Sequence, residues 1–381
     1  IKNSTLFIED VQFSLAGEIE GKNVNLDISA ENQKVKSVLS HMPEKFKSVC
    51  STFSADGDLS CKGIIKGKIS KTSNPHFNMD FAVTNGDFKL KENPFHLSAL
   101  QLSGNIDNGS SNNFENTLIK VENCSAKTEN GTLSGAFQVN NLNNYYLSID
   151  INSNLDLAEI NHLFKSTPFF NMKGTLVGNT KYNGFLSFSQ KMKQNFLAGQ
   201  HQSDLQLNEV EFQHKNSPLI FGFQSLNGQI NDNKILVEKS DITISDSDFK
   251  FDGTISNFIP YLLNAATKMQ VEGNLQSVYV KFDELLTIKD INKGEGRLVS
   301  TMPNWIEVDL HANIEQLSYQ YFVAENIDAG IDYRNYTLKV KDVKMNTLNG
   351  EVTGEAKFYE QPYNYLKLFT SSHLEKINIR N

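Results

Sequence analysis

The chain has 381 residues, of which 39% are hydrophobic and 21% are charged, so it is long enough for two or three ordinary domains. Its formal net charge is −8 and it has no Arg-rich or aromatic-interleaved basic segment, which excludes a typical nucleic-acid-binding protein. No run of about 18 apolar residues occurs, so nothing in the sequence predicts a membrane-spanning helix.

The first 50 residues predict strands followed by a helix. Apolar and polar residues alternate over residues 5–28 in three short segments, which is the pattern of half-buried strands. Residues 34–49 then carry apolar residues at helical spacing. Pro43 is expected to interrupt this helix, because proline cannot donate a backbone hydrogen bond.

Alternation resumes over residues 59–88, again indicating strands. The Asn-Gly dipeptide at 85–86 predicts a tight hairpin, because type I′ turns need positive φ at both central positions. On this prediction, residues 77–83 pair antiparallel with residues 88–90. The Asn-Gly dipeptide at 130–131 predicts another hairpin.

Residues 133–164 combine the elements that recur along the chain. They begin with an apolar-x-Gly-x-apolar strand and an Asn-rich turn at 140–144. An alternating strand with Leu147, Ile149 and Ile151 on one face follows, and then a short amphipathic helix. Similar glycine-centred strings recur in the same order, which indicates a diverged internal repeat. The recurring glycines are Gly17, Gly135, Gly253 and Gly354.

The rest of the chain continues the strand pattern with few helices. A helix is expected over 258–269 and another over 282–286, while 184–195 fits either a short helix or a loose flap. Further strands are expected within residues 174–182, 205–212, 219–223, 234–255, 271–280, 306–314 and 338–345.

These elements predict a mainly β fold: a long antiparallel meander of repeated units, curled into a groove-like taco or open-barrel sheet with a few short helices. The expected division is a partial first repeat at 1–99, a second at 100–222, a third at 223–303 and a truncated fourth at 304–381. The 44 Asn residues fit many tight reversals, since Asn tolerates left-handed conformations.

Three Cys residues, Cys50, Cys61 and Cys124, have no spacing typical of metal ligands. Three free thiols are the favoured interpretation, and a Cys50–Cys61 bridge stays open as the alternative. The chain begins with Ile1 and stops within a repeat, so it is expected to be part of a longer protein, with any signal or anchor lying upstream.

Three features resemble the AsmA/TamB-like family of bacterial envelope proteins, in particular the AsmA-like C-terminal region of Bacteroidetes-type chains. They are the recurring LxGxI strands, the strand-to-helix passages at 24–39 and 147–164, and the segment 306–354 with the string VDLHANIEQLSYQYFVAENIDAGI. These motifs are structural and not catalytic.

The resemblance implies a location and a function. Members of the family are anchored in the inner membrane by an N-terminal helix, and they project an apolar β-groove into the periplasm. The groove is thought to carry phospholipid towards the outer membrane. The resemblance therefore implies a periplasmic protein, joined to the inner membrane by a segment outside these residues, that supports outer-membrane biogenesis with unidentified envelope partners.

The groove candidates are large apolar residues that alternate with polar ones. An ordinary sandwich core predicts the same alternation, so the sequence does not distinguish an open groove from a closed core. The candidates are Phe77, Met79, Phe81, Leu147, Ile149, Ile151, Phe249, Phe251, Ile306, Val308 and Leu310.

Other functions find less support. An extracellular or cell-surface β-sandwich adhesin or glycan-binding protein is the alternative, but Trp305 is the single Trp available to stack on a sugar. No GxSxG, P-loop or GxGxxG motif occurs and the His residues are dispersed. We therefore expect neither an enzyme, a cofactor nor a metal site.

Overall fold

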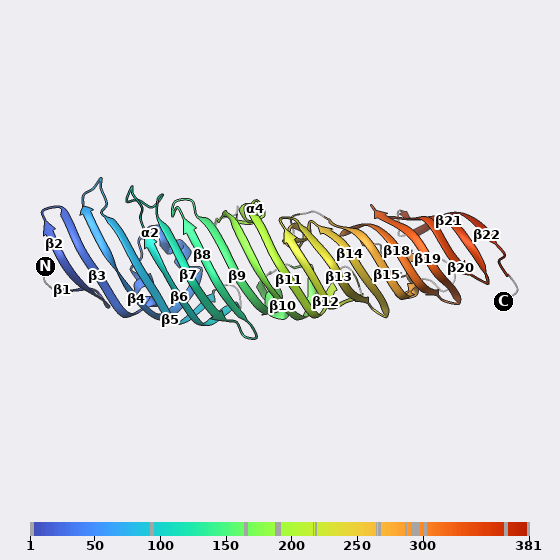
Figure 1. The fold of residues 1–381 in the computed structure, drawn as a ribbon, viewed down its shortest axis with the longest axis horizontal. Coiled ribbons are helices and arrows are strands. Elements are labelled where there is room, and N and C mark those ends of the chain that lie inside the picture. Colours follow the sequence, from blue (N-terminus) through green and yellow to red (C-terminus); the bar gives the residue numbers. More distant parts are fainter. Residues whose placement is uncertain are drawn as a thin grey trace. The chain divides into compact units, whose positions relative to one another are not determined.

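The computed structural model describes residues 4–91, 95–163, 167–186, 192–215, 217, 219–263, 265, 268–285, 288–290, 298–300, 303–361 and 365–378. This part of the chain is mainly β, and its long antiparallel meander confirms the predicted fold class (Figure 1). The strands are β1 (Ser4–Ile8), β2 (Val11–Glu20), β3 (Asn23–Lys34), β4 (Phe53–Lys68), β5 (His76–Leu90), β6 (His96–Asp107), β7 (Leu118–Lys127), β8 (Thr132–Asn140), β9 (Tyr146–Asp156), β10 (Phe169–Phe185), β11 (Gln200–His214), β12 (Ile220–Asn231), β13 (Lys234–Ile244), β14 (Ser247–Ser256), β15 (Met269–Lys281), β16 (Ile288–Asp290), β17 (Leu298–Ser300), β18 (Ile306–Tyr319), β19 (Phe322–Arg334), β20 (Thr337–Thr347), β21 (Gly350–Gln361) and β22 (Tyr365–Glu375). The helices are α1 (Val35–Ser40), α2 (Glu44–Cys50), α3 (Leu157–Leu163), α4 (Met192–Leu197), α5 (Phe258–Leu262) and α6 (Phe282–Leu285).

The chain forms two compact units. Unit 1 consists of Ile1–Leu163 and Val177–Ser203, and unit 2 consists of Phe164–Leu176 and Asp204–Asn381. The four-part division expected from the repeats is a finer one, and it stays a prediction.

The sheet of unit 1 is a simple meander. Each strand from β1 to β9 pairs antiparallel with the next, and β9 also pairs with β10. The described residues of the stretch 133–164, which end at Leu163, fold as expected into β8, a turn, β9 and α3. Pro43 separates α1 from α2, as predicted, and the Asn-Gly dipeptide at 130–131 lies in the tight β7–β8 connection, where the Thr128 N–H donates to the Gly131 carbonyl at 3.0 Å.

In the described part of unit 2, β15 and β18 form a parallel strand pair that the sequence did not indicate. Strands β12 to β15 pair antiparallel in order, but β15 then pairs parallel with β18, with Val271 opposite Val308. From β18 to β22 the antiparallel order resumes. The chain between β15 and β18 holds α6 and the short hairpin β16–β17. The expected helix at 258–269 is described only as α5, which ends at Leu262.

The predicted hairpin at residues 85–86 is wrong. Strand β5 runs through these residues without a break, and it pairs with β4 and β6 along its length. Asn85 does have positive φ, at 52°, but the pairing register shifts there between Val83 and Gly86. The dipeptide therefore forms a β-bulge, which uses the same left-handed backbone as a turn without reversing the chain.

Bulges of this kind recur in unit 1 and bend its strands. Register shifts also occur between Ala30 and Gln33 and between Ser98 and Gln101. Because a bulge increases local twist and bends its strand, repeated bulges curl a sheet. Nine of the nineteen non-glycine residues with positive φ in the described ranges are Asn, so the Asn enrichment serves bulges as well as turns.

The four glycines that mark the repeats share one backbone geometry. Each has a φ between 136° and 158°, and a Cβ built on it would lie 2.1–2.2 Å from a carbonyl oxygen of the neighbouring strand. Gly63 and Gly104 make equally close approaches, so this geometry also occurs outside the four landmarks. In each case the strands come too close together for a side chain, as expected at a sharp bend of a sheet.

We expect Gly253→Ala to lower the free energy of unfolding of unit 2 by at least about 2 kcal/mol, because the residue has φ +158° and no room for a Cβ. Gly330→Ala is the matched control in the same unit, since its nearest neighbour atoms lie 3.7 Å and 3.8 Å away. Urea denaturation of both variants measures the difference. Equal stabilities would contradict the close approach.

Candidate functional site

One face of the unit 1 sheet is a continuous apolar surface, which we call the floor. Residues that lie directly opposite one another on successive strands point to the same face. Three rows cross the sheet in this way. They are Ile28, Gly63, Met79, Ile106, Ile119, Val139 and Leu147; Ala30, Cys61, Phe81, Gly104, Val121, Phe137 and Ile149; and Leu59, Val83, Leu102, Cys124, Gly135 and Ile151.

The floor brings together the six candidates that the sequence placed in unit 1. Phe77 joins its edge, opposite Ile65 of β4. Six gaps separate the seven strands from β3 to β9, so the floor extends about 29 Å across the strands. Half the hydrocarbon core of a bilayer is about 15 Å thick, so this length exceeds that of one acyl chain.

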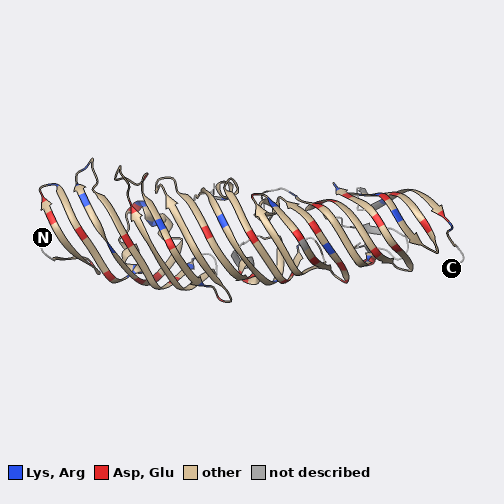
Figure 2. Cartoon of the chain, viewed as in Figure 1, with Lys and Arg blue, Asp and Glu red and all other residues tan. Residues whose placement is uncertain are grey.

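Most of the floor is partly accessible to solvent, since Ala30 and Val121 are buried and the other residues of its three rows are half-buried. All six candidates in unit 1 are half-buried, whereas charged neighbours on the other face, such as Asp80 and Asp150, are exposed. Figure 2 shows acidic and basic residues interspersed along the strands. Within the described residues, each of the three buried hydrophobic clusters belongs to unit 2.

Two helices bridge the curled sheet of unit 1. Strand ends alternate between two rims: the first rim carries the connections after β1, β3, β5 and β7, and the second rim those after β2, β4, β6 and β8. Helices α1 and α2 leave from the first rim, yet the Phe46 ring of α2 packs edge-on against Phe114 of the β6–β7 connection, 5.5 Å between centroids. The Lys45 Nζ lies 4.4 Å from the centroid of the Phe114 ring. It also donates a hydrogen bond to Asn143 Oδ1 in the β8–β9 connection. Opposite rims therefore meet across the helices.

The groove candidates in unit 2 are, as a group, more buried than those in unit 1. Phe249 is 6% exposed and Phe251 is 4% exposed, and each belongs to a buried cluster. Ile306, Val308 and Leu310 of β18 are half-buried, and they lie opposite Met269, Val271 and Gly273 of β15. Around Phe249 and Phe251, the apolar face of unit 2 is therefore covered by other apolar side chains of the same unit.

An aromatic cluster, which we call the clasp, holds the rims of unit 2 together. His214 ends β11 and Phe169 begins β10, whereas Tyr261 lies on α5 and Trp305 precedes β18. The His214 ring stacks on Trp305 at 4.1 Å, and its Nε2 shares a hydrogen bond of 2.6 Å with the Tyr261 hydroxyl. Since β11 ends at the opposite rim from the start of β18, these contacts close the sheet.

Burial controls the charge of the clasp. His214 is fully buried, and desolvation lowers its pKa from 6.5 to about 4, with a smaller contribution from nearby Lys215. Desolvation also raises the pKa of Tyr261 to about 12. Both groups are therefore neutral at pH 7, and the hydrogen bond between them joins two uncharged partners.

We expect unit 2 to lose stability as the pH falls from 6.5 to about 4. Above pH 6.5 His214 is neutral in both states, whereas in this window the unfolded chain binds a proton that the folded chain does not. The loss attributable to His214 is at most about 3 kcal/mol. Trp305 is the single Trp, so its fluorescence during urea unfolding reports on unit 2. In His214→Gln this pH dependence should flatten; an unchanged slope would contradict the assignment.

Two of the three thiols lie on the floor. Cys61 is opposite Phe81, and Cys124 is opposite Gly135. All three cysteines are free, which confirms the favoured interpretation over a Cys50–Cys61 bridge. Burial raises the pKa of both Cys61 and Cys124, so the thiol form prevails there at neutral pH.

Sequence reasoning missed a small ionic cluster at the start of unit 1. The His41 Nε2 lies 3.2 Å from Asp10 Oδ1 and 3.6 Å from Glu9 Oε2, and the Ser37 hydroxyl donates to Asp10. Asp10 and His41 lie 31 positions apart in the sequence, so local patterns gave no sign of this pairing. The cluster attaches α1 to the β1–β2 turn and is solvent-exposed at both carboxylates.

Comparisons with known proteins add no neighbour. No family model, no curated protein and no solved structure matches this chain. Within the described residues, each helix is too short or too polar to cross a bilayer.

Proposed function

We propose that the floor of unit 1 binds acyl chains of phospholipids, and that the protein serves as a lipid-binding part of an AsmA-like envelope protein. The observation that carries this proposal is the floor itself: three apolar rows, half-buried except at Ala30 and Val121, on a sheet without a closed core cluster in its described residues.

The energetics support acyl-chain binding. Each methylene transferred from water to the floor contributes about 0.8 kcal/mol. The backbone groups below the floor are already paired within the sheet, so bound hydrocarbon leaves no donor or acceptor unsatisfied. The floor carries no charged side chain in its three rows, so neighbouring positions along it offer similar binding energy, which favours sliding.

The resemblance to AsmA/TamB-like proteins supplies the biological setting of the proposal. In that setting the protein resides in the periplasm, is anchored to the inner membrane through a segment outside these residues, and supports outer-membrane biogenesis by passing phospholipid between membranes. We propose binding and not catalysis. Trp305 is 8% exposed and belongs to the clasp, so it offers no surface for stacking on a glycan, which disfavours the adhesin alternative.

Native mass spectrometry after expression in bacteria tests the proposal. Co-purifying phospholipid, or saturable binding of a fluorescent fatty acid to delipidated protein, is the expected result. A protein that purifies without lipid and does not bind the fatty acid would contradict it.

A further inference from the structure

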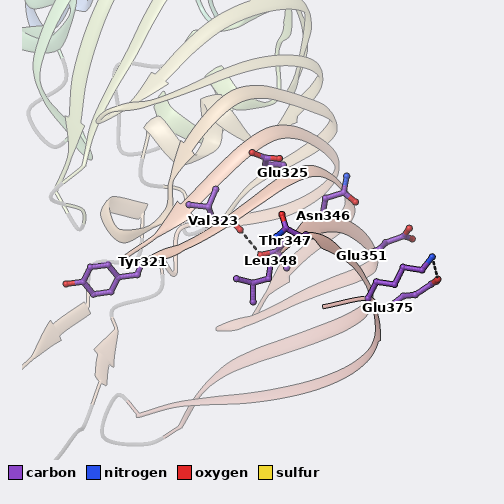
Figure 3. A pocket seen from close by; sticks show the side chains of 11 residues that line it. Tyr321, Val323, Glu325, Asn346, Thr347, Leu348, Glu351 and Glu375 are labelled. Carbon is purple, nitrogen blue, oxygen red and sulfur yellow. Dashed lines mark hydrogen bonds and ion pairs between the residues drawn. The ribbon is translucent and has the colours of Figure 1, made fainter. Parts of the chain in front are cut away.

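A second candidate surface lies in unit 2, where the β18–β19 and β20–β21 hairpins turn. A pocket of about 650 Å³ opens between the two turns, and we call it the tip pocket. Figure 3 shows Val323 and Leu348 in its centre, with Glu325, Glu351 and Glu375 around them. The outer wall is thus acidic and the centre is apolar.

Leu348, in the apolar centre of the pocket, has a backbone conformation that leucine disfavours. Leu348 and Asn349 form the β20–β21 turn with φ values of 47° and 59°, a conformation that favours Gly and Asn and is strained for a bulky apolar residue. The Leu348 side chain is nevertheless 44% exposed, so burial within the chain does not offset the strain. Strain of this kind at an exposed position is characteristic of binding sites.

The β18–β19 turn displays further apolar surface. Tyr321 is fully exposed, and Phe322 and Val323 are 38% and 42% exposed. Contiguous exposed apolar residues bordered by polar ones mark interaction sites. The two turns together form one such patch.

Both turns are held rigidly. The Thr347 hydroxyl of β20 donates to the Val323 carbonyl of β19 at 2.7 Å, which fixes one turn to the other. The Gln320 N–H donates to the Asp283 carboxylate of α6 at 2.9 Å. A preorganised surface loses little conformational entropy on binding.

Charge identifies the kind of partner. Among the described residues that line the pocket there are three carboxylates and one cation, Lys376, which is paired with Glu375 at 3.0 Å. An anionic lipid surface would be repelled by these groups, whereas Lys or Arg side chains would be attracted to them. The apolar centre requires an apolar side chain between such cations.

We propose that the tip pocket docks a segment of a partner protein that places an apolar side chain against Val323 and Leu348 and basic side chains against Glu325 and Glu351. The partner is recognised by this alternation of apolar and cationic residues. The tip pocket belongs to unit 2, whereas the floor belongs to unit 1.

The test uses a fluorescein-labelled synthetic peptide of alternating Leu and Lys, and a matched peptide of alternating Leu and Glu, with binding followed by fluorescence anisotropy. The Leu/Lys peptide should bind and the Leu/Glu peptide should not. Leu348→Asn keeps the turn, because Asn suits positive φ, and should weaken binding at least about tenfold. Glu325→Gln with Glu351→Gln should do the same.

The control removes two carboxylates elsewhere: Glu18→Gln with Glu20→Gln on β2 of unit 1, which should leave peptide affinity unchanged. Equal binding of the two peptides, or equal losses in the control and the pocket variants, would overturn the proposal. Vesicles of phosphatidylcholine with phosphatidylglycerol form the last arm. If they bind through Leu348 while the Leu/Lys peptide does not, the surface is a membrane contact and the proposal is wrong.

Discussion

We expect the substitution Phe81→Asp to abolish acyl-chain binding while unit 1 remains folded. Phe81 lies in the central row of the floor, opposite Cys61 and Gly104, and is half-buried. An ionised carboxylate there remains hydrated in the free protein because the floor is open. Bound hydrocarbon would remove that water from an unpaired charge, which costs several kcal/mol. Affinity for a fluorescent fatty acid should fall at least about a hundredfold.

Ala82→Asp provides the matched control for this variant. Ala82 is the next residue on β5, is also half-buried, and points to the opposite face. The Ala82→Asp variant should bind the fatty acid with the same affinity as the unsubstituted protein. Circular dichroism and thermal unfolding establish that both variants fold, and Phe81→Ser replaces Phe81→Asp if the charged variant does not. Retained binding in a folded Phe81→Asp protein would show that lipid does not lie on the floor.

Phe251→Asp has the opposite outcome and unfolds unit 2. Phe251 is 4% exposed and packs with Leu226 and Val237 in a buried cluster. Removing a buried Phe side chain costs about 3–5 kcal/mol, and an unpaired buried charge adds several more. Together these costs approach the whole stability of an ordinary domain, about 5–15 kcal/mol.

Hydrogen exchange measured by mass spectrometry reports each unit separately. In Phe251→Asp, amide protection should be lost in β12–β15 and retained in β4–β8. Lys250→Asp, at the exposed neighbouring position, should preserve both. A folded Phe251→Asp protein that had lost only lipid binding would show instead that the floor is open in unit 2 as well.

Strand alternation is a local property, so the sequence could predict which residues share a face of the sheet. Phe77, Met79 and Phe81 had to share a face once β5 was recognised, and the same holds for Leu147, Ile149 and Ile151 of β9. The short helices were also recognisable from local spacing and from Pro43. Alternation could not predict how exposed each apolar side chain is. Residues with the same pattern are half-buried in β5 and fully buried in β14.

The long-range contacts escaped sequence reasoning for a physical reason. His214 stacks on Trp305, and Phe46 packs against Phe114, only because the sheet curls and brings its opposite rims together. That curl comes from bulges and close strand approaches, and a bulge at Asn85 uses the same residues and backbone conformation as a turn. The Asn-Gly signal was therefore genuine, but its structural meaning depended on pairing with β4 and β6.

Thiol protection tests the central claim most directly, because Cys61 and Cys124 already lie on the floor and Cys50, on α2, belongs to none of its three rows. Delipidated protein is treated with a maleimide, with and without phospholipid, and modification of each thiol is followed by mass spectrometry. If acyl chains occupy the floor, lipid slows the modification of Cys61 and Cys124 and leaves that of Cys50 unchanged. Equal rates at Cys61 and Cys124 with and without bound lipid would contradict the account.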